Sequence, residues 1–371
     1  MDEARAPVSD TRGETLEDGI GIALSGGGYR AMLFHLGAIV RLFETGVLQR
    51  AARISSVSGG SITSAKLALE WPHLTDRAAL FDRVVGPIRQ LARTSVDVPS
   101  ILTGLLLRGS AAQRVSDVYA KMLFGDATLQ DLPQQPVFVI NATSVETGKL
   151  WRFSRRRARE WSVGEIAAPT FALADVVAAS SAFPPVLSPF VLETRASDFT
   201  HVEPGVDPHL LHDVTLTDGG VYDNLGLETV FKRYRTLFVS DGGAALAIDP
   251  APPADWAQHA KRVLDIIHGQ VSSVRVRQLI AAYVSGERDG AYWGIGTDIA
   301  HYDLADALAA PHARTRELAR TPTRLTRVDE RLQEQLINWG YAVSDAGLRR
   351  HGGLDPAQVP APAYPYPQSG I

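Results

Sequence analysis

Hydrophobic and polar residues follow two different periods along the chain, and these periods predict strands and helices in alternation. Short apolar runs end at small residues, and apolar positions three and four apart then follow, as at Leu33, Leu36 and Val40. The first predicted elements are a strand at 20–24, a helix at 29–44, a strand at 54–57 and a helix at 61–70. A glycine-rich turn separates each strand from its helix. This order is typical of a parallel sheet with crossover helices.

The later pattern extends the same architecture. Further strands are predicted at 137–142, 150–153, 214–217 and 236–240, and long helices at 256–285 and 329–349. We expect one α/β domain over residues 19–350, a three-layer sandwich in which helices flank a mainly parallel central sheet. Residues 71–130 are predicted to be a helical insertion. Residues 1–18 and the proline-rich residues 351–371 are predicted to be flexible tails.

Composition narrows the classes of function. The 371 residues carry a formal net charge of −4, and the pI near 6.2 is unlike that of a nucleic-acid-binding domain. The chain has no cysteine, so disulfides, thiol nucleophiles and cysteine-ligated metals are excluded. The polar N-terminus does not resemble a signal peptide, and no run of about 18 apolar residues predicts a membrane-spanning helix. We therefore expect a cytoplasmic protein that can still contact a membrane peripherally.

Two segments are candidates for that membrane contact. Residues 98–107, VPSILTGLLL, are the most lipid-like stretch, and they suit a buried core helix, a lid or an interfacial patch. Residues 152–159 contain five arginines, which suit a solvated face beside a strand or a contact with anionic headgroups.

The first glycine-rich turn is a candidate anion site. Gly26, Gly27 and Gly28 lie between a predicted strand and a predicted helix, and Arg30 follows them. Backbone N–H groups at such a turn stabilise a phosphate or the oxyanion of an acyl intermediate. The same residues match a dinucleotide fingerprint, but the next strand ends without the acidic residue that holds the ribose.

The second glycine-rich turn offers a nucleophile. A serine at a sharp strand-to-helix elbow needs small residues two positions before and after it. Ser58 has Ser56 before it and Gly60 after it, which predicts that geometry for Ser58.

A candidate base ends a later strand. Asp218 is followed by Gly219 and Gly220, and a carboxylate near a serine acts as general base if desolvation raises its pKa. A second Asp-Gly-Gly begins at Asp241. His268 follows Asp218 in the order Ser…Asp…His, so a Ser–His–Asp triad is an alternative.

Four segments together resemble the patatin-like phospholipase family of acyl hydrolases. They occur in the family's order: SGGGYRAMLFHLGAIVRLFETGVL, SSVSGGSI, AASSAFPPVLSP and DGGVYDNLG. Ser56 and Ala31 stand where the family pattern usually has glycine.

The resemblance implies a site without metal or cofactor. It makes Ser58 the nucleophile and Asp218 its base, with Gly26, Gly27, Gly28 and Arg30 as the oxyanion loop, and it favours Asp218 over Asp241. The implied activity is hydrolysis of fatty-acyl esters of phospholipids or lysophospholipids, with transient membrane contact. The alternatives are an esterase with a histidine triad and a catalytically weak, lipid-binding member of the fold.

Overall fold

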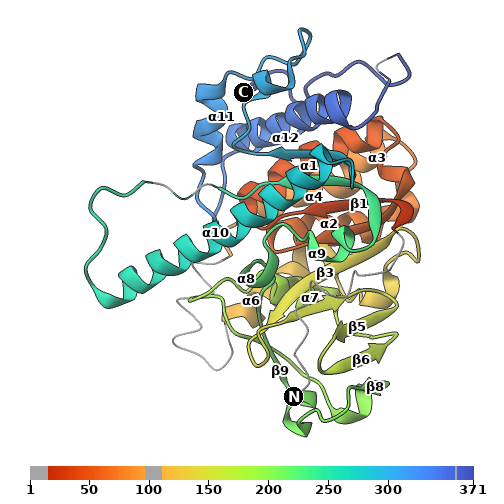
Figure 1. The fold of residues 1–371 in the computed structure, drawn as a ribbon, viewed down its shortest axis with the longest axis vertical. Coiled ribbons are helices and arrows are strands. Elements are labelled where there is room, and N and C mark those ends of the chain that lie inside the picture. Colours follow the sequence, from red (N-terminus) through yellow and green to blue (C-terminus); the bar gives the residue numbers. More distant parts are fainter. Residues whose placement is uncertain (1–15, 97–110, 245, 247, 356) are drawn as a thin grey trace.

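The computed structural model describes residues 16–371 except 97–110, 245, 247 and 356. Five parallel strands form one side of its sheet (Figure 1), from the edge inward in the order β11 (Asp289–Gly294), β10 (Tyr234–Asp241), β1 (Glu17–Leu24), β2 (Ala51–Ser56) and β3 (Val137–Ser144). Antiparallel strands extend it beyond β3: β4 (Leu150–Phe153), β5 (Arg157–Glu160), β6 (Gly164–Ala167) and β8 (His201–Val202). The mainly parallel central sheet expected from the sequence is confirmed, and the antiparallel extension adds to it.

One strand changes its neighbour halfway along, and this change creates the site. The first half of β3 pairs with β2, up to Ile140 opposite Ser56. Beyond that point β2 has ended, and β9 (Val214–Asp218) takes its place beside β3, with Asp218 opposite Ala142. Because β9 runs antiparallel to β3, its last residue meets the end of β2. A third strand, β7 (Phe190–Leu192), pairs with β9 on its other side.

Helices cover both faces of the sheet. Ile22 and Leu24 of β1 point into the larger hydrophobic cluster, which contains α1 (Gly28–Glu44), α2 (Gly59–Glu70), α7 (Leu173–Ser180) and α12 (Glu330–His351). Ala23, between them, points into a second cluster with α9 (Glu228–Phe231) and α10 (Trp256–Val284). Alternate residues of a strand face opposite sides, so the chain has the expected three layers.

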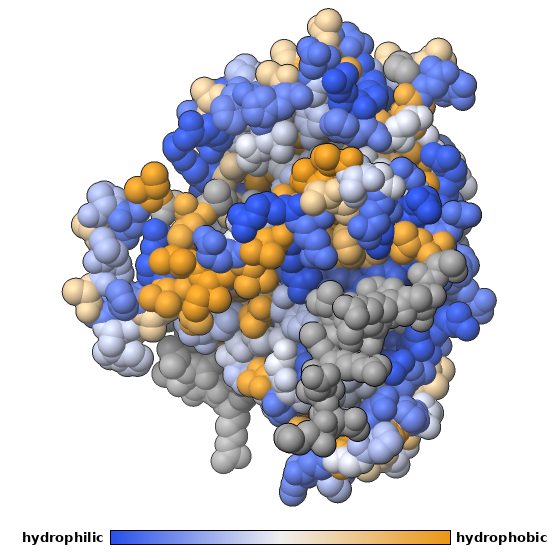
Figure 2. Space-filling model, viewed as in Figure 1, coloured by the Kyte–Doolittle hydropathy of each residue, from blue (hydrophilic) through white to orange (hydrophobic). Residues whose placement is uncertain are grey.

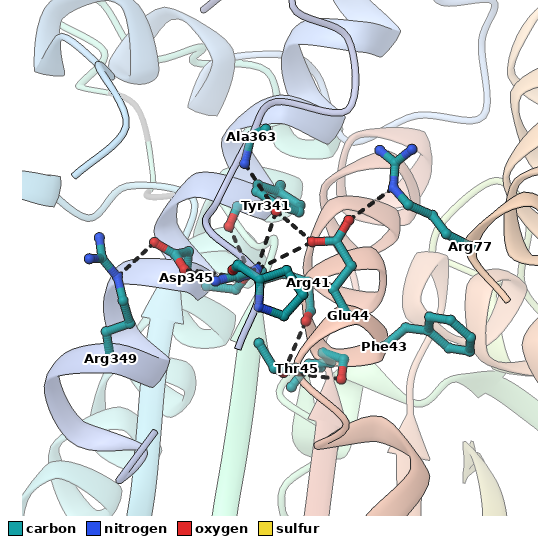
Figure 3. Close-up of polar contacts among 12 residues, drawn as sticks. Arg41, Phe43, Glu44, Thr45, Arg77, Tyr341, Asp345, Arg349 and Ala363 are labelled. Carbon is teal, nitrogen blue, oxygen red and sulfur yellow. Dashed lines mark hydrogen bonds and ion pairs between the residues drawn. The ribbon is translucent and has the colours of Figure 1, made fainter. Parts of the chain in front are cut away.

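Two glycines bring α1 and α12 into close contact. A Cβ on Gly37 would lie 1.9 Å from the carbonyl oxygen of Ile337, and one on Gly340 would lie 1.9 Å from that of Phe34. Beside this crossing the buried Arg41 pairs with Asp345, 2.7 Å away, as the polar network in Figure 3 shows. These contacts join an early helix to the last one.

The remaining elements are short. The insertion at 71–130 is helical where it is described, with α3 (Arg77–Leu80), η4 (Phe81–Val85), α4 (Gly86–Ala92), α6 (Ala111–Tyr119) and η5 (Ala120–Phe124). Residues 98–107 lie outside the described residues. The other helices and turns are α8 (Gly220–Asp223), α11 (His312–Ala319), η2 (Leu48–Arg50), η3 (Trp71–His73), η6 (Leu129–Asp131), η7 (Ala196–Asp198), η8 (Pro208–Leu211) and η9 (Ile299–Tyr302).

The C-terminal end differs from the tail predicted for it, whereas residues 1–15 of the predicted N-terminal tail lie outside the described residues. β1 begins at Glu17, whose N–H bonds the carbonyl of Arg233. At the other end, Asn338 of α12 donates to the carbonyls of Tyr366 and Gly370 and accepts from the N–H of Tyr366. The proline-rich segment is therefore bonded to α12 and is not a free tail.

Candidate active site

Ser58 lies at a sharp turn between β2 and α2. Its backbone has φ 53° and ψ −121°, a conformation that costs free energy for a residue with a side chain and often marks a functional site. Gly60 fits because a Cβ there would lie 2.5 Å from the carbonyl of Leu24. Ser56, the last residue of β2, is fully buried and bonds the carbonyl of Val139. Ser56 and Gly60 therefore lie in tightly packed surroundings that leave little room for larger side chains.

Two side chains that the sequence did not single out hold this elbow. Ser180, at the end of α7, accepts from the N–H of Ser58 at 3.0 Å and donates to the carbonyl of Asn141. Asn141 in turn donates to the carbonyl of Ser56 at 2.9 Å. Ser180 belongs to the segment AASSAFPPVLSP, so a signal for it existed. For Asn141 the sequence offered none.

Asp218 ends β9 beside the elbow. Its N–H bonds the carbonyl of Ala182, and its Oδ1 accepts from the N–H of Gly220 at 2.7 Å. Burial raises the pKa of this carboxyl to about 7, although the Gly220 amide and the Ser58 hydroxyl, as donors, act to lower it. The carboxyl is therefore partly ionised at neutral pH.

The approach of Ser58 to Asp218 is close but loosely aligned. The Ser58 hydroxyl influences the pKa of Asp218 as a hydrogen-bond donor. Nevertheless, Oδ2 of Asp218 is buried without a well-formed hydrogen bond to any described residue. Catalytic hydrogen bonds are often long until a substrate binds. The two side chains are 7% and 1% exposed, respectively, so the pair is shielded from bulk water.

The glycine loop lies against the elbow. A Cβ on Gly26 would come within 3.2 Å of the Ser58 Cβ, and one on Gly59 would lie 2.2 Å from the carbonyl oxygen of Gly28. Gly27 and Gly28 have φ 142° and 61°, values that favour glycine. No described residue accepts from the N–H of either of these two, whereas the N–H of Gly26 donates to the carbonyl of Asn224 at 2.9 Å.

Arg30 bonds the backbone of neighbouring segments. Its guanidinium donates to the carbonyls of Gly242 and Thr321, and burial lowers its pKa to about 10. It therefore remains charged at neutral pH. The sequence analysis placed Arg30 in the oxyanion loop. In the structure its hydrogen bonds join that loop to Gly242, directly after β10, and to Thr321.

Asn224 is a further site residue, to which the sequence analysis gave no role. Its Oδ1 lies 2.4 Å from a Cβ built on Gly26 and 2.6 Å from one built on Gly220. The side chain thus fills the space between the glycine loop and the turn after Asp218. It could have been found from the segment DGGVYDNLG, in which it follows the aspartate.

Neither His268 nor His35, a buried histidine of α1, bonds the Ser58–Asp218 pair. His35 bonds the carbonyl of Ser25 through Nε2 at 2.9 Å and the hydroxyl of Ser240 through Nδ1 at 2.8 Å, and burial lowers its pKa to about 4. It is a neutral support of the glycine loop. His268 lies on α10 against Phe183, with ring centroids 6.4 Å apart. Its Nε2 is buried without a hydrogen bond to any described residue.

The arginine-rich segment is largely occupied by protein contacts. Arg157 pairs with Glu165 at 3.2 Å, Arg159 with Glu203 at 3.4 Å, and Arg155 donates to the carbonyl of Leu132. This favours the solvated face over a headgroup site. Among the described residues, no cluster of side chains suited to a metal ion occurs.

The chain belongs to the patatin-like phospholipase family. The family model matches residues 22–231, more than half of the chain and the part that contains Ser58, Asp218 and the glycine loop. Membership of this family supports lipid hydrolysis as the general class of activity. A comparison with curated proteins gave no match.

Solved structures with a similar fold include phospholipases. Human GIVD cytosolic phospholipase A2 in complex with methyl gamma-linolenyl fluorophosphonate is 16% identical with a TM-score of 0.51, covering 92% of this chain and 60% of that one. A second structure of the human enzyme has 16% identity, a TM-score of 0.42 and coverage of 72% and 51%. VipD from Legionella pneumophila has 15% identity, a TM-score of 0.36 and coverage of 91% and 67%. The chain thus spans little more than half of the human structures, and the first likeness shows the fold.

Proposed function

We propose that this protein hydrolyses fatty-acyl ester bonds of phospholipids or lysophospholipids through a Ser58–Asp218 dyad. The observation that carries the proposal is the meeting of the strained Ser58 elbow with a buried carboxyl whose pKa is near 7. An aspartate at its ordinary pKa is a weak base, and burial brings it close to the working pH.

Acylation requires one proton to move twice. Asp218 takes the proton from Ser58 as Oγ attacks the ester carbonyl carbon, and the carbonyl electron pair moves to the oxygen. The tetrahedral intermediate then collapses, the bond to the alcohol breaks, and Asp218 returns the proton to that alcohol. A buried carboxyl suits this cycle because it holds a proton at little cost near neutral pH.

The oxyanion needs donors that no other group occupies. The N–H groups of Gly27 and Gly28 meet that condition among the described residues, while the N–H of Gly26 is already bonded. We therefore assign the donor role to Gly27 and Gly28, with Gly26 as the close-packing residue beside Ser58. Arg30 contributes its charge and anchors the loop.

Deacylation repeats the chemistry with water. Asp218 accepts a proton from the attacking water, the new tetrahedral intermediate collapses, and Ser58 Oγ leaves with that proton. The products are a fatty acid and the free enzyme. No metal or cofactor takes part in this scheme.

The alternatives have less support. A Ser–His–Asp triad needs a histidine bonded to Ser58, and His268 has no such bond. A lipid-binding protein without catalysis would not need an ionisable carboxyl held beside a strained serine. An acyl chain is the expected substrate group because the chain belongs to the patatin-like phospholipase family.

Hydrolysis of a medium-chain p-nitrophenyl ester tests the proposal. With EDTA present throughout, Ser58→Ala and Asp218→Asn should be inactive and His268→Ala active. Ser64→Ala is the matched control, because Ser64 lies on the same helix and its buried hydroxyl has no hydrogen bond to a described residue.

Loss of activity in folded His268→Ala would favour the triad. Absence of wild-type activity on both this ester and phospholipid would favour the binding protein.

A further inference from the structure

The long helix α10 packs on the protein by only one side. Arg275 pairs with Glu228 at 3.1 Å and donates to the carbonyl of Tyr222, and Tyr283 donates to the carbonyl of Leu237 at 2.8 Å. Leu279 and Ala282 are buried on the same side. In Figure 1 the N-terminal end of α10 projects beyond the rest of the molecule.

The side of α10 next to the packed one is apolar and exposed. We call this surface the outer stripe. Its members recur at helical spacing, so they share one face of the helix, and they are Trp256, Val263, Leu264, Ile267, Val271 and Val274. Trp256 is 85% exposed, Ile267 54% and Val274 53%. Figure 2 shows hydrophobic side chains gathered along the course of this helix. Such a patch marks an interaction site rather than ordinary surface.

The charge of α10 is opposite to that of the chain. The helix contains four Lys or Arg residues and one Asp, a net charge of +3, while the whole chain carries −4. Lys261 is paired with Asp265 and Arg275 with Glu228, whereas Arg277 is exposed. A second copy of this helix would bring like charge against like charge. An anionic lipid surface is attracted by it, and a helix with apolar and basic residues inserts its apolar face at such a surface.

We propose that the outer stripe of α10 docks on the surface of an anionic phospholipid membrane. Trp256 and the branched side chains enter the interface, and the exposed Arg277 meets the headgroups. The inference extends the proposed function, on which it rests for the use of lipid as substrate.

The position of α10 would bring a bound membrane close to the candidate active site. Its inner side bonds α8, which directly follows Asp218 and Gly219, and His268 packs on Phe183 from the segment that supports the elbow. A membrane bound by the outer stripe would therefore lie one helix away from the catalytic pair. The family model ends at residue 231, so α10 lies outside the part it matches.

Vesicle binding by the Ser58→Ala variant tests docking independently of catalysis. The probes are vesicles of phosphatidylcholine with phosphatidylglycerol and vesicles of phosphatidylcholine alone. We expect cosedimentation with the anionic vesicles, weakened by salt. Ile267→Glu and Val274→Glu should each lower the partition coefficient about tenfold or more, because each removes an inserted side chain and adds a repelled charge.

Val202→Glu is the matched control. Val202 is 38% exposed on β8, far from α10 in Figure 1, and this variant should bind as well as the parent. Trp256 supplies a spectroscopic check: a blue shift of emission on anionic vesicles should be absent in Trp256→Phe.

Each result decides the proposal. Equal binding of all variants, absence of vesicle binding, or a dimer in sedimentation equilibrium that Ile267→Glu dissociates would overturn it. Activity on the soluble p-nitrophenyl ester reports on the dyad separately, so a failure of docking and a failure of the proposed chemistry are distinguishable.

Discussion

Two turns of this protein have the same sequence, Asp-Gly-Gly, and each begins at the last residue of a strand, Asp218 of β9 and Asp241 of β10. In both, Oδ1 of the carboxyl accepts from the N–H two residues later, and burial raises the pKa of the carboxyl. Asp218 is buried, whereas Asp241 is partly buried. They differ at the other oxygen. Oδ2 of Asp218 has no well-formed hydrogen bond to a described residue, whereas Oδ2 of Asp241 accepts from the Tyr292 hydroxyl at 2.9 Å.

The neighbouring strand explains the difference. Asp218 ends β9, which meets the end of β2 and therefore Ser58. Asp241 ends β10, which runs beside β1 and therefore meets Ser25 and the charge of Arg30. In the proposed mechanism Asp218 exchanges a proton, while Asp241 lies against the glycine loop through Ser25. The same three residues thus acquire different roles from their surroundings.

The largest expected effect is a difference in kcat/KM between the Asp218→Asn and Asp241→Asn variants. Asp218→Asn should lower kcat/KM for an acyl ester about 10²- to 10⁴-fold, because it removes the general base. Asp241→Asn should lower it less than about tenfold, because an amide oxygen can still accept from Tyr292. Steady-state kinetics on both folded variants measures this contrast. Equal losses would remove the distinction between the two turns.

The pH dependence of activity is the next prediction. Because the base works as a carboxylate and the pKa of Asp218 is about 7, kcat/KM should rise with pH and level off above about 7. Below that pKa it should fall about tenfold for each pH unit. Asp241→Asn should leave this profile in place. A flat profile across neutral pH would show that another group is the base.

Stability should change in the opposite direction to activity. The pKa of Asp218 is about 7 in the folded protein and near 3.8 as a model group, so the folded state holds this proton more tightly. Its contribution to stability is complete below the unfolded pKa and is lost as pH rises through about 7. Above that pH, Asp218→Asn should raise the free energy of unfolding by up to about 4 kcal/mol. Denaturant unfolding at acid and alkaline pH measures the gain, which would vanish if the carboxyl were solvated.

Tyr292→Phe should give the smallest effect. It removes the donor to Oδ2 of Asp241 and should destabilise the fold by about 1 to 2 kcal/mol, while the pH profile of activity keeps its midpoint. Thermal unfolding and the same kinetic assay test both parts. A shifted midpoint would place Asp241 in the proton transfer.

Local pattern was enough to predict the elements that carry the site. The apolar runs and glycine turns around Gly26 and Ser58 gave strands and helices whose positions the structure confirms within a few residues. Contacts between segments that are far apart in the chain leave no such pattern in the sequence. Ser180 and Asn141 support the elbow through contacts across the fold, and Asn338 binds a proline-rich segment that composition alone made appear free. The role of Arg30 depends on carbonyls more than 200 residues away.

Labelling with a fluorophosphonate acyl-chain analogue tests the central claim most directly, since it reports the nucleophile and its activation in one experiment. Peptide mass spectrometry should locate the adduct on Ser58. The labelling rate should rise with pH through about 7, fall strongly in Asp218→Asn and change little in Asp241→Asn. An adduct on another residue, or a Ser58 adduct formed equally fast in Asp218→Asn, would contradict the Ser58–Asp218 dyad.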